Sequence, residues 1–143
     1  MTGDEYIIAS QIREINAKIN HDLRNEFKDS DFTIPQIIFM KILNKNIMMK
    51  INEISKEMNL ANSTVSGIAD RLEKQNIISR TRSDKDKRIV NIQLTDKGKE
   101  VVGEFRESIN HYFEESFGKF TQEEINTILE GLDFLKKALH IKE

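Results

Sequence analysis

The chain has 143 residues and a mass of 16.7 kDa, which is the size of one ordinary domain. Charged residues make up 32% and hydrophobic residues 38%, and no apolar run reaches the roughly 18 residues of a membrane span. The absence of cysteine excludes disulfides, thiolate metal sites, cysteine nucleophiles and thiol-based redox sensing. The acidic start, Met1–Glu5, does not resemble a secretory signal, so we expect a cytoplasmic protein.

The net charge of −2 is distributed unevenly along the chain. Residues 1–40 hold 4 Lys/Arg and 7 Asp/Glu, residues 41–99 hold 13 and 7, and residues 100–143 hold 5 and 10. The three segments therefore carry net charges of −3, +6 and −5. Because salt screens charges within about 8–10 Å, the local surplus is the informative quantity, and a basic middle favours a surface that binds a polyanion. If the charges are considered by themselves, a chance fluctuation in the surface charge of an ordinary helical domain is an equally good explanation.

Two helices are predicted before the basic segment. In residues 6–27, apolar side chains recur at spacings of three or four, the stripe of one long amphipathic helix. A polar break follows at residues 28–31. Thr33 is then a predicted N-cap, with Gln36 completing a capping box and Pro35 in the first turn. This second helix is apolar nearly all round, and we expect it to lie at the centre of the fold.

The basic segment predicts a helix-turn-helix followed by a β-hairpin. A third helix begins near Ile51, a fourth ends near Gln75, and residues 59–62 form the tight turn between them. The period then changes, and residues 77–82 and 89–94 have the β-branched, alternating pattern of strands. Helix, helix, turn, helix and hairpin in this order predict a winged helix-turn-helix, mainly α with a small β-hairpin wing.

Two further helices are predicted after the hairpin. Thr95 is the expected cap of a long helix, with Asp96 at the positive end of its dipole. Thr121 and Glu124 form a second capping box, which begins the last helix. Both helices carry apolar stripes.

The fourth helix has the properties of a recognition helix. At about 100° per residue, Val65, Ile68, Ala69 and Leu72 share one face and would pack on the preceding helices. The opposite face carries small hydroxyls, a glycine and cations, which allow close approach to phosphates and base edges. The candidate DNA contacts of this helix are Ser63, Thr64, Ser66, Gly67, Arg71 and Lys74. Asp70 opposes phosphate, so we interpret it as an ion-pair partner. For any one serine, a solvated surface hydroxyl is the plainer explanation.

The charged loop between the strands, residues 83–88, is the second candidate contact. A hairpin tip is thin enough to enter a minor groove or to lie on the DNA backbone beside the recognition helix. The candidate contacts of the wing are Arg82, Lys85, Lys87 and Arg88. Arg80 lies on the strand that leads in, and the aspartates of the loop would orient the arginines. The alternative is a solvated turn that blunts an edge strand, which is less convincing directly after a helix-turn-helix.

These motifs together resemble the MarR family of bacterial transcriptional regulators. The segments that carry the resemblance are Thr33–Gln36, Ile51–Ser55, Asn62–Ser66, Asp70–Glu73, Ile77–Arg80, Asp84–Arg88 and Leu94–Gly98. Any one of them is weak, but in this order and at these spacings they are specific. Asn62, which opens its motif, joins the candidate DNA contacts. Two positions depart from the family pattern: Lys87 stands where arginine is frequent, and Asn76 where glycine is preferred, although asparagine tolerates a left-handed conformation.

The resemblance implies a homodimer that binds double-stranded DNA at a pseudo-palindromic operator, as a repressor. It implies an N-terminal dimerisation helix at residues 1–31, a winged helix-turn-helix DNA-binding lobe at residues 32–98 and C-terminal dimerisation helices at residues 99–143. Physical reasoning agrees, since two recognition helices one DNA turn apart, about 34 Å, require a dimer. The terminal helices also carry more apolar surface than a small lobe can cover.

The resemblance further implies control by a small phenolic or anionic effector bound between the dimer helices and the DNA-binding lobe. The candidate ligand-binding residues are Arg13, His21, Phe39 and Met40, together with Met48 and Met49. For Phe39 and the methionines, a place in the apolar core is the plainer explanation. The three histidines are too scattered to predict a zinc site by spacing, so we expect no metal and no cofactor; a site built from His21 and acids distant in the sequence is the alternative.

Two rival functions are weaker. An enzyme is not expected, because the chain has no Gly-rich phosphate loop, no nucleophile motif, no HExxH and no cofactor fingerprint. A winged helix used only for protein contacts would not need the cluster of cations at the wing.

Overall fold

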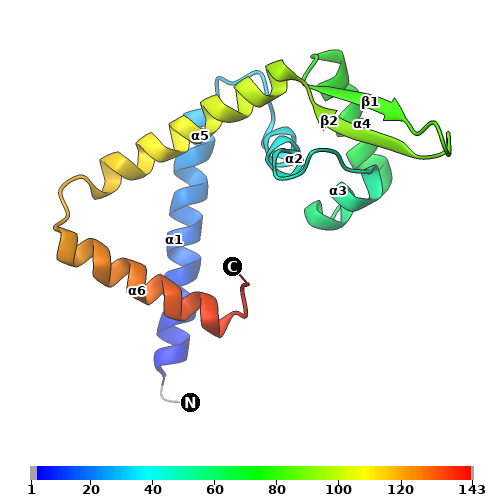
Figure 1. Cartoon of the computed structure of the whole chain (residues 1–143). Coiled ribbons are helices and arrows are strands. Elements are labelled where there is room, and N and C mark those ends of the chain that lie inside the picture. The colour runs from blue at the N-terminus through cyan, green and yellow to red at the C-terminus, as the bar shows by residue number, and fades with distance from the viewer. Residues whose placement is uncertain (1–2, 143) are drawn as a thin grey trace. The chain divides into compact units, whose positions relative to one another are not determined.

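The computed structural model describes residues 3–142 and divides the chain into two compact units, residues 1–106 and 107–143. Figure 1 shows the order of its elements. They are α1 (Asp4–Phe27), α2 (Ile34–Asn44), α3 (Ile51–Met58), α4 (Asn62–Lys74), β1 (Ile78–Arg82), β2 (Val90–Leu94), α5 (Asp96–Phe117) and α6 (Gln122–Ala138). The predicted fold class, mainly α with a small β-hairpin in a winged helix-turn-helix, is confirmed.

The hydrophobic core of the first unit lies among α2, α3, α4 and the hairpin. Its largest completely buried side chains are Phe39, Met40, Leu43, Ile54, Val65, Leu72, Ile77 and Ile92. Burial of each such side chain contributes about 1.5–3 kcal/mol. As predicted, α2 is the central helix. Its start is confirmed as well, because Thr33 Oγ1 accepts a hydrogen bond from the Gln36 N–H (3.3 Å) while the Thr33 N–H donates to Gln36 Oε1 (2.9 Å).

The helix-turn-helix is formed by α3 and α4. Helix α3 ends at Asn59, which has the left-handed φ of 54° that lets the chain turn sharply. Ala61 is the N-cap of α4, so Asn62 is the first residue of this helix rather than the last residue of the turn. The boundary moves by one residue, within the usual variation of helix ends.

The wing is a two-stranded antiparallel sheet in which Ile78 pairs with Leu94 and Arg82 with Val90. Each strand begins one residue later than predicted. Ile77 is instead completely buried before β1, where its N–H donates to the Leu72 carbonyl at 2.9 Å. The left-handed conformation expected of the preceding residue, Asn76, is confirmed by its φ of 61°.

A short third strand position was not predicted from the sequence. Met49 forms an isolated antiparallel bridge with Ile92, in which the two residues exchange N–H to carbonyl hydrogen bonds of 2.9 and 2.7 Å. A one-residue bridge has no alternating pattern of its own, so periodicity could not reveal it. The bridge attaches the connection before α3 to β2, at the edge of that strand opposite β1.

The start of α5 is joined to the end of α4. Thr95 Oγ1 accepts from the Gly98 N–H at 3.0 Å, as the predicted cap, and also donates to the Asn76 carbonyl at 2.6 Å. Lys97 Nζ donates to the Gln75 carbonyl at 3.0 Å. A Cβ at Gly98 would lie 2.2 Å from the Ile77 carbonyl oxygen, so this close approach requires glycine.

The long helices differ from this lobe in burial. No residue of α1 is buried among the residues that the structure describes, although Phe27 makes an edge-to-face contact with Phe105 at 5.0 Å. In the second unit, Thr121 and Glu124 form the predicted capping box of α6. The pKa of Glu124 is held below its ordinary value, mainly by the hydrogen bond with the backbone N–H of Thr121 and secondarily by the interaction with the Thr121 hydroxyl. The described part of α6 likewise has no buried residue.

No described helix is long and apolar enough to cross a lipid bilayer.

Candidate nucleic-acid interface

Helix α4 separates an apolar face from a polar one, as the sequence predicts. Val65, Ala69 and Leu72 are completely buried, and Ile68 is 9% exposed. The candidate contacts lie on the other side. Asn62, Ser63, Thr64, Gly67, Arg71 and Lys74 are exposed, and Ser66 is half-buried. The packing of the apolar face on α2 and α3 therefore determines which side chains of α4 face solvent.

The backbone in the N-terminal half of α4 is accessible to a ligand that approaches it closely. The N-cap residue Ala61 supplies no side-chain acceptor, so it leaves the N–H groups of the first turn available to a phosphate oxygen. A Cβ added at Gly67 would meet no atom within 4 Å. Small side chains and free amides on one exposed turn allow the helix backbone to approach DNA closely.

The loop of the wing, residues 83–89, is organised by one aspartate. Asp86 Oδ1 accepts from Arg88 Nε at 3.1 Å and from the Arg88 backbone N–H at 3.0 Å, and Asp86 Oδ2 accepts from Arg88 Nη2 at 3.2 Å. The side-chain hydrogen bond, and secondarily the backbone one, holds the pKa of Asp86 below its ordinary value. The predicted orienting role is therefore confirmed for Asp86 and Arg88. The Arg88 side chain remains 90% exposed while it is paired.

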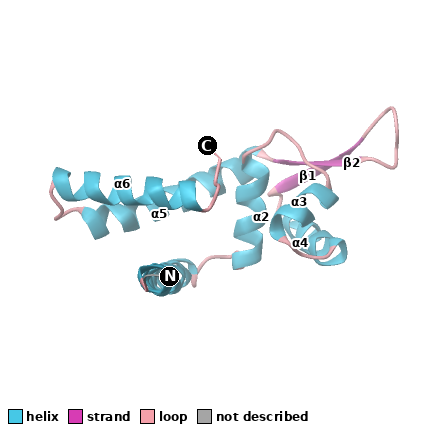
Figure 2. Cartoon of the chain, turned by 90° about the horizontal axis from the view of Figure 1, so that it is seen from below, coloured by secondary structure: helices cyan, strands magenta, loops and turns pink. Residues whose placement is uncertain are grey.

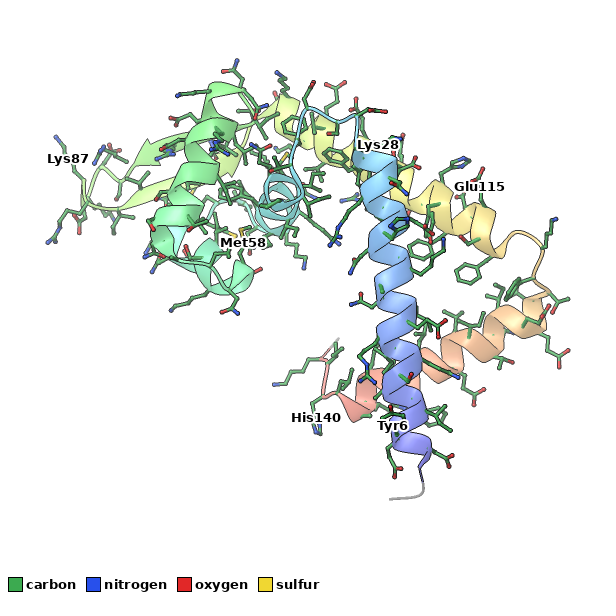
Figure 3. All side chains as sticks on the ribbon, turned by 180° about the vertical axis from the view of Figure 1, so that it is seen from behind. Tyr6, Lys28, Met58, Lys87, Glu115 and His140 are labelled. Atoms are coloured by element: carbon green, nitrogen blue, oxygen red, sulfur yellow. The ribbon has the colours of Figure 1, made fainter. Side chains whose placement is uncertain are left out.

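The remaining cations of the wing lie around this turn. The loop joins β1 and β2 and projects away from α3 and α4 (Figure 2). Lys87 lies at the tip of the loop in Figure 3, and both Lys85 and Lys87 are exposed. Arg82 Nη1 donates to the Lys87 carbonyl at 2.9 Å, which supports the loop from the end of β1. Three exposed cations thus lie within a few residues on one projecting turn, with Arg82 at its base.

The interpretation of Asp70 as an ion-pair partner is confirmed. Arg80 Nη2 donates to Asp70 Oδ1, and Arg80 Nε lies 3.4 Å from Glu73 Oε2. Sequence reasoning did not identify Glu73 as the second acid, although it lies three residues after Asp70 and so on the adjacent turn of the same helix. Arg80, which the sequence placed with the cations of the wing, is thus engaged by α4.

The candidate ligand-binding residues do not form one surface. Arg13 and His21 are exposed on α1, whereas Phe39 and Met40 are completely buried in the core formed around α2. Of the additional methionines, Met49 is buried and Met48 is 46% exposed. Among the residues that the structure describes, no group of three or more His, Asp and Glu side chains could hold a metal ion.

A recognition helix with an open polar face, beside a projecting hairpin that carries cations, defines a winged helix-turn-helix DNA-binding protein. The family is found by comparison: the family model described as "MarR family" matches residues 32–90. The chain is also 31% identical over 118 residues to the uncharacterized HTH-type transcriptional regulator YsmB of Bacillus subtilis (strain 168), covering 82% of this chain and 81% of YsmB. The chain belongs to the MarR family.

Two further similarities agree with this assignment. The chain is 32% identical over 91 residues to the HTH-type transcriptional repressor MdtR of Bacillus subtilis (strain 168), covering 64% of this chain and 59% of MdtR. It shares its fold with a MarR family protein from Bacillus stearothermophilus, at a TM-score of 0.88 and 24% identity, covering 98% of this chain and 99% of that one. As a member of the MarR family, the protein is a DNA-binding transcriptional regulator and not an enzyme.

Proposed function

We propose that the protein is a homodimeric repressor that binds a pseudo-palindromic operator and is released from it by a small phenolic or anionic ligand. The observation that carries the proposal is the apolar surface of the long helices. On α6, Leu129 is 59% and Leu132 49% exposed, and Leu139, the C-cap residue of this helix, is 59% exposed. On α1, Ile8 is 52% and Ile15 58% exposed. Apolar side chains repeated along two whole helices fit a surface that a second copy covers.

The proposed dimer explains how two DNA-binding lobes would act together. A two-fold axis repeats each recognition helix, and half-sites one turn apart need a spacing of about 34 Å between the two copies. We assign dimerisation to residues 1–31 and 99–143 and DNA binding to residues 32–98. In this arrangement the two assembly segments carry net charges of −3 and −4, and the DNA-binding segment, with a net charge of +5, faces the phosphates.

At each half-site, α4 would lie in the major groove and the wing on the adjacent minor groove or backbone. The proposed contacts are Asn62, Ser63, Thr64, Ser66, Gly67, Arg71, Lys74, Arg82, Lys85, Lys87 and Arg88. Their exposure on one helix face and one projecting loop supports this assignment. The cations supply affinity that depends on salt, and the small polar side chains supply contacts near base edges.

Repression and ligand control rest on separate support. MdtR, which shares 32% identity over 91 residues with this chain, is named a repressor. A dimer that covers its operator can block transcription by occupying the DNA. For the ligand, Arg13 and His21 offer exposed polar groups that suit an anionic or phenolic molecule. Since Phe39 and Met40 are completely buried, a ligand could reach them only after the core around α2 opens. As a regulator of bacterial genes, the protein would act in the cytoplasm.

Footprinting on the DNA upstream of the protein's own gene tests the proposal directly. We expect a protected palindrome, and its release by at least one member of a panel of phenolic and anionic compounds. Sedimentation of the free protein should give a dimer, and removal of residues 121–143 should abolish it. A stable monomer that binds the operator as tightly as the full chain would contradict the dimer. A protected site without symmetry would contradict the operator model.

A further inference from the structure

The DNA-binding surface of the lobe contains two carboxylates as well as its cations. Asp70 and Glu73 are three residues apart on α4, and their side chains are 60% and 47% exposed. Asp70 shares the exposed face with Gly67 and Lys74. Acidic side chains at this place repel the phosphates of DNA. Their presence among candidate DNA contacts therefore needs an explanation other than phosphate binding.

Arg80 occupies a position on β1 where the strand pattern calls for an apolar residue. It pairs across the hairpin with Ile92, and Ile78 lies two residues before it on the same face of the strand. Ile92 is completely buried and Ile78 is 2% exposed, so this is the inner face of the wing. That face packs against α4. The Arg80 side chain is only 27% exposed.

A guanidinium held on this inner face requires nearby acids. Removing a charge from water costs free energy unless the charge is paired and hydrogen-bonded. Asp70 supplies a hydrogen-bonded partner at Nη2, and Glu73 supplies a second negative charge 3.4 Å from Nε, whose N–H is buried and makes no hydrogen bond within the described residues. The planar fork of arginine can engage two carboxylates at once, which a lysine ammonium does less well. The contact is thus a link between the recognition helix and the first strand of the wing.

We propose that Arg80 is a positioning residue for operator recognition, which holds the wing at a fixed distance from the recognition helix by bridging Asp70 and Glu73. The inference rests on the proposed function, in which α4 and the wing bind one half-site together. A fixed spacing lets both elements bind without further ordering, which lowers the entropic cost of binding. The bridge also neutralises part of the acidic charge beside the DNA.

The test measures fluorescence anisotropy of the full-length protein with two duplexes of equal length, the footprinted operator and a scrambled sequence, over a series of salt concentrations. The variants are Arg80→Ala, Arg80→Lys, the double acid variant Asp70→Asn with Glu73→Gln, and the combination of all three changes that remove the bridge. Lys87→Ala is the matched control, because it removes an exposed cation that has no part in the bridge.

We expect Arg80→Ala and the double acid variant each to weaken operator binding about tenfold, because both break the same bridge. The combined variant should bind no more weakly than either one. The salt slope of Arg80→Ala should stay close to that of the parent, whereas the double acid variant, which removes two carboxylates that repel phosphate, should bind the scrambled duplex at least as tightly as the parent. Arg80→Lys should restore part of the lost affinity. Lys87→Ala should weaken binding to both duplexes and lower the salt slope by about one.

Other results would overturn the proposal. If Arg80→Ala lowers the salt slope by about one while the double acid variant tightens operator binding, Arg80 is a phosphate contact. If the variants lower the melting temperature but bind the operator like the parent, the bridge only stabilises the fold. If Arg80→Ala does not fold, the operator affinity and melting temperature of the double acid variant decide between these explanations. A parent protein without preference for any duplex would contradict the proposed function itself, and the positioning role with it.

Discussion

The DNA-binding lobe and the long helices of this chain differ in how far their apolar side chains are buried. In the lobe, Phe39, Leu72 and Ile92 come from three different elements and are completely buried in one hydrophobic core. On the described part of α6, Leu129 and Leu132 repeat at helical spacing and remain about half exposed. The lobe therefore has a core of its own, whereas α6 exposes a stripe that resembles one half of a core.

This difference shows that a similar apolar pattern has two physical meanings. A helix whose stripe is buried within the chain contributes to the stability of that chain. A helix whose stripe is exposed contributes only when another surface covers it. We therefore expect changes in the lobe to alter unfolding of the protein, and changes in the stripe to alter assembly and, through assembly, operator binding. The predictions below test this separation, from the largest expected effect to the smallest.

The largest effect is expected from Leu132→Asp on α6. An aspartate in the exposed stripe would bring a charge into the proposed dimer interface, where it has no partner. We expect a monomer in sedimentation at micromolar concentration and a loss of operator affinity of about 100-fold or more, because linkage of two half-sites is lost.

Glu130→Ala is the matched control, since it lies on the other side of the same helix and is exposed. The control should remain dimeric. A dimeric Leu132→Asp protein with parental affinity would show that the stripe is not the interface, and the contrast between the two regions would then fail.

The next effect is expected inside the lobe, from Gly98→Ala. The new Cβ would lie 2.2 Å from the Ile77 carbonyl oxygen and 3.0 Å from Leu94 Cδ2, so the junction between α4 and α5 would have to shift. We expect a loss of about 2 kcal/mol or more in the free energy of unfolding, measured by urea denaturation. Gly103→Ala, in the same helix but with no atom within 4 Å of the added Cβ, should leave stability unchanged or raise it by about 1 kcal/mol. Equal effects at both glycines would contradict the close contact.

Most of the fold was predictable because its signals are local. Capping boxes at Thr33 and Thr121, the apolar face of α4 and the change of period at the wing are all properties of short segments, and the structure confirms them. The bridge between Met49 and Ile92 was not predictable, since it joins residues far apart in the sequence and leaves no periodic pattern.

The candidate interface was predictable in outline but not in its internal contacts. An acid on a DNA-facing helix already identifies Asp70 as an ion-pair partner, because phosphate repels it. The sequence does not say that this partner is Arg80, because the pairing depends on how β1 packs on α4. The same limit applies to Phe39 and Met40. Residue type alone did not distinguish a ligand-lining position from a core position, and the structure buries both completely.

A smaller effect is expected at the tip of the wing, from Arg88→Ala. This side chain is 90% exposed and contacts only Asp86 among the hydrogen bonds and ion pairs of the described residues. Melting and dimerisation should therefore stay nearly unchanged. Operator affinity should fall several-fold and the salt slope by about one, as measured by anisotropy titrations at several salt concentrations.

Lys119→Ala, which removes an exposed cation of the second unit, is the control for net charge. Its salt slope should match that of the parent. An unchanged slope in Arg88→Ala would show that the wing does not contact DNA in the proposed way.

The smallest effect concerns the protonation of Asp86. Hydrogen bonds from Arg88 hold its pKa below the ordinary aspartate value of about 3.9, so its contribution to the wing turn is present above that value and is lost as the pH falls through the lowered pKa. Between about pH 5 and pH 8 the carboxylate stays ionised, and this group should cause no change in operator binding. NMR titration of the Asp86 carboxyl carbon should give a midpoint below the ordinary value in the parent and a higher one in Arg88→Ala. Identical midpoints in the two proteins would mean that the Arg88 side chain does not pair with the Asp86 carboxylate in solution.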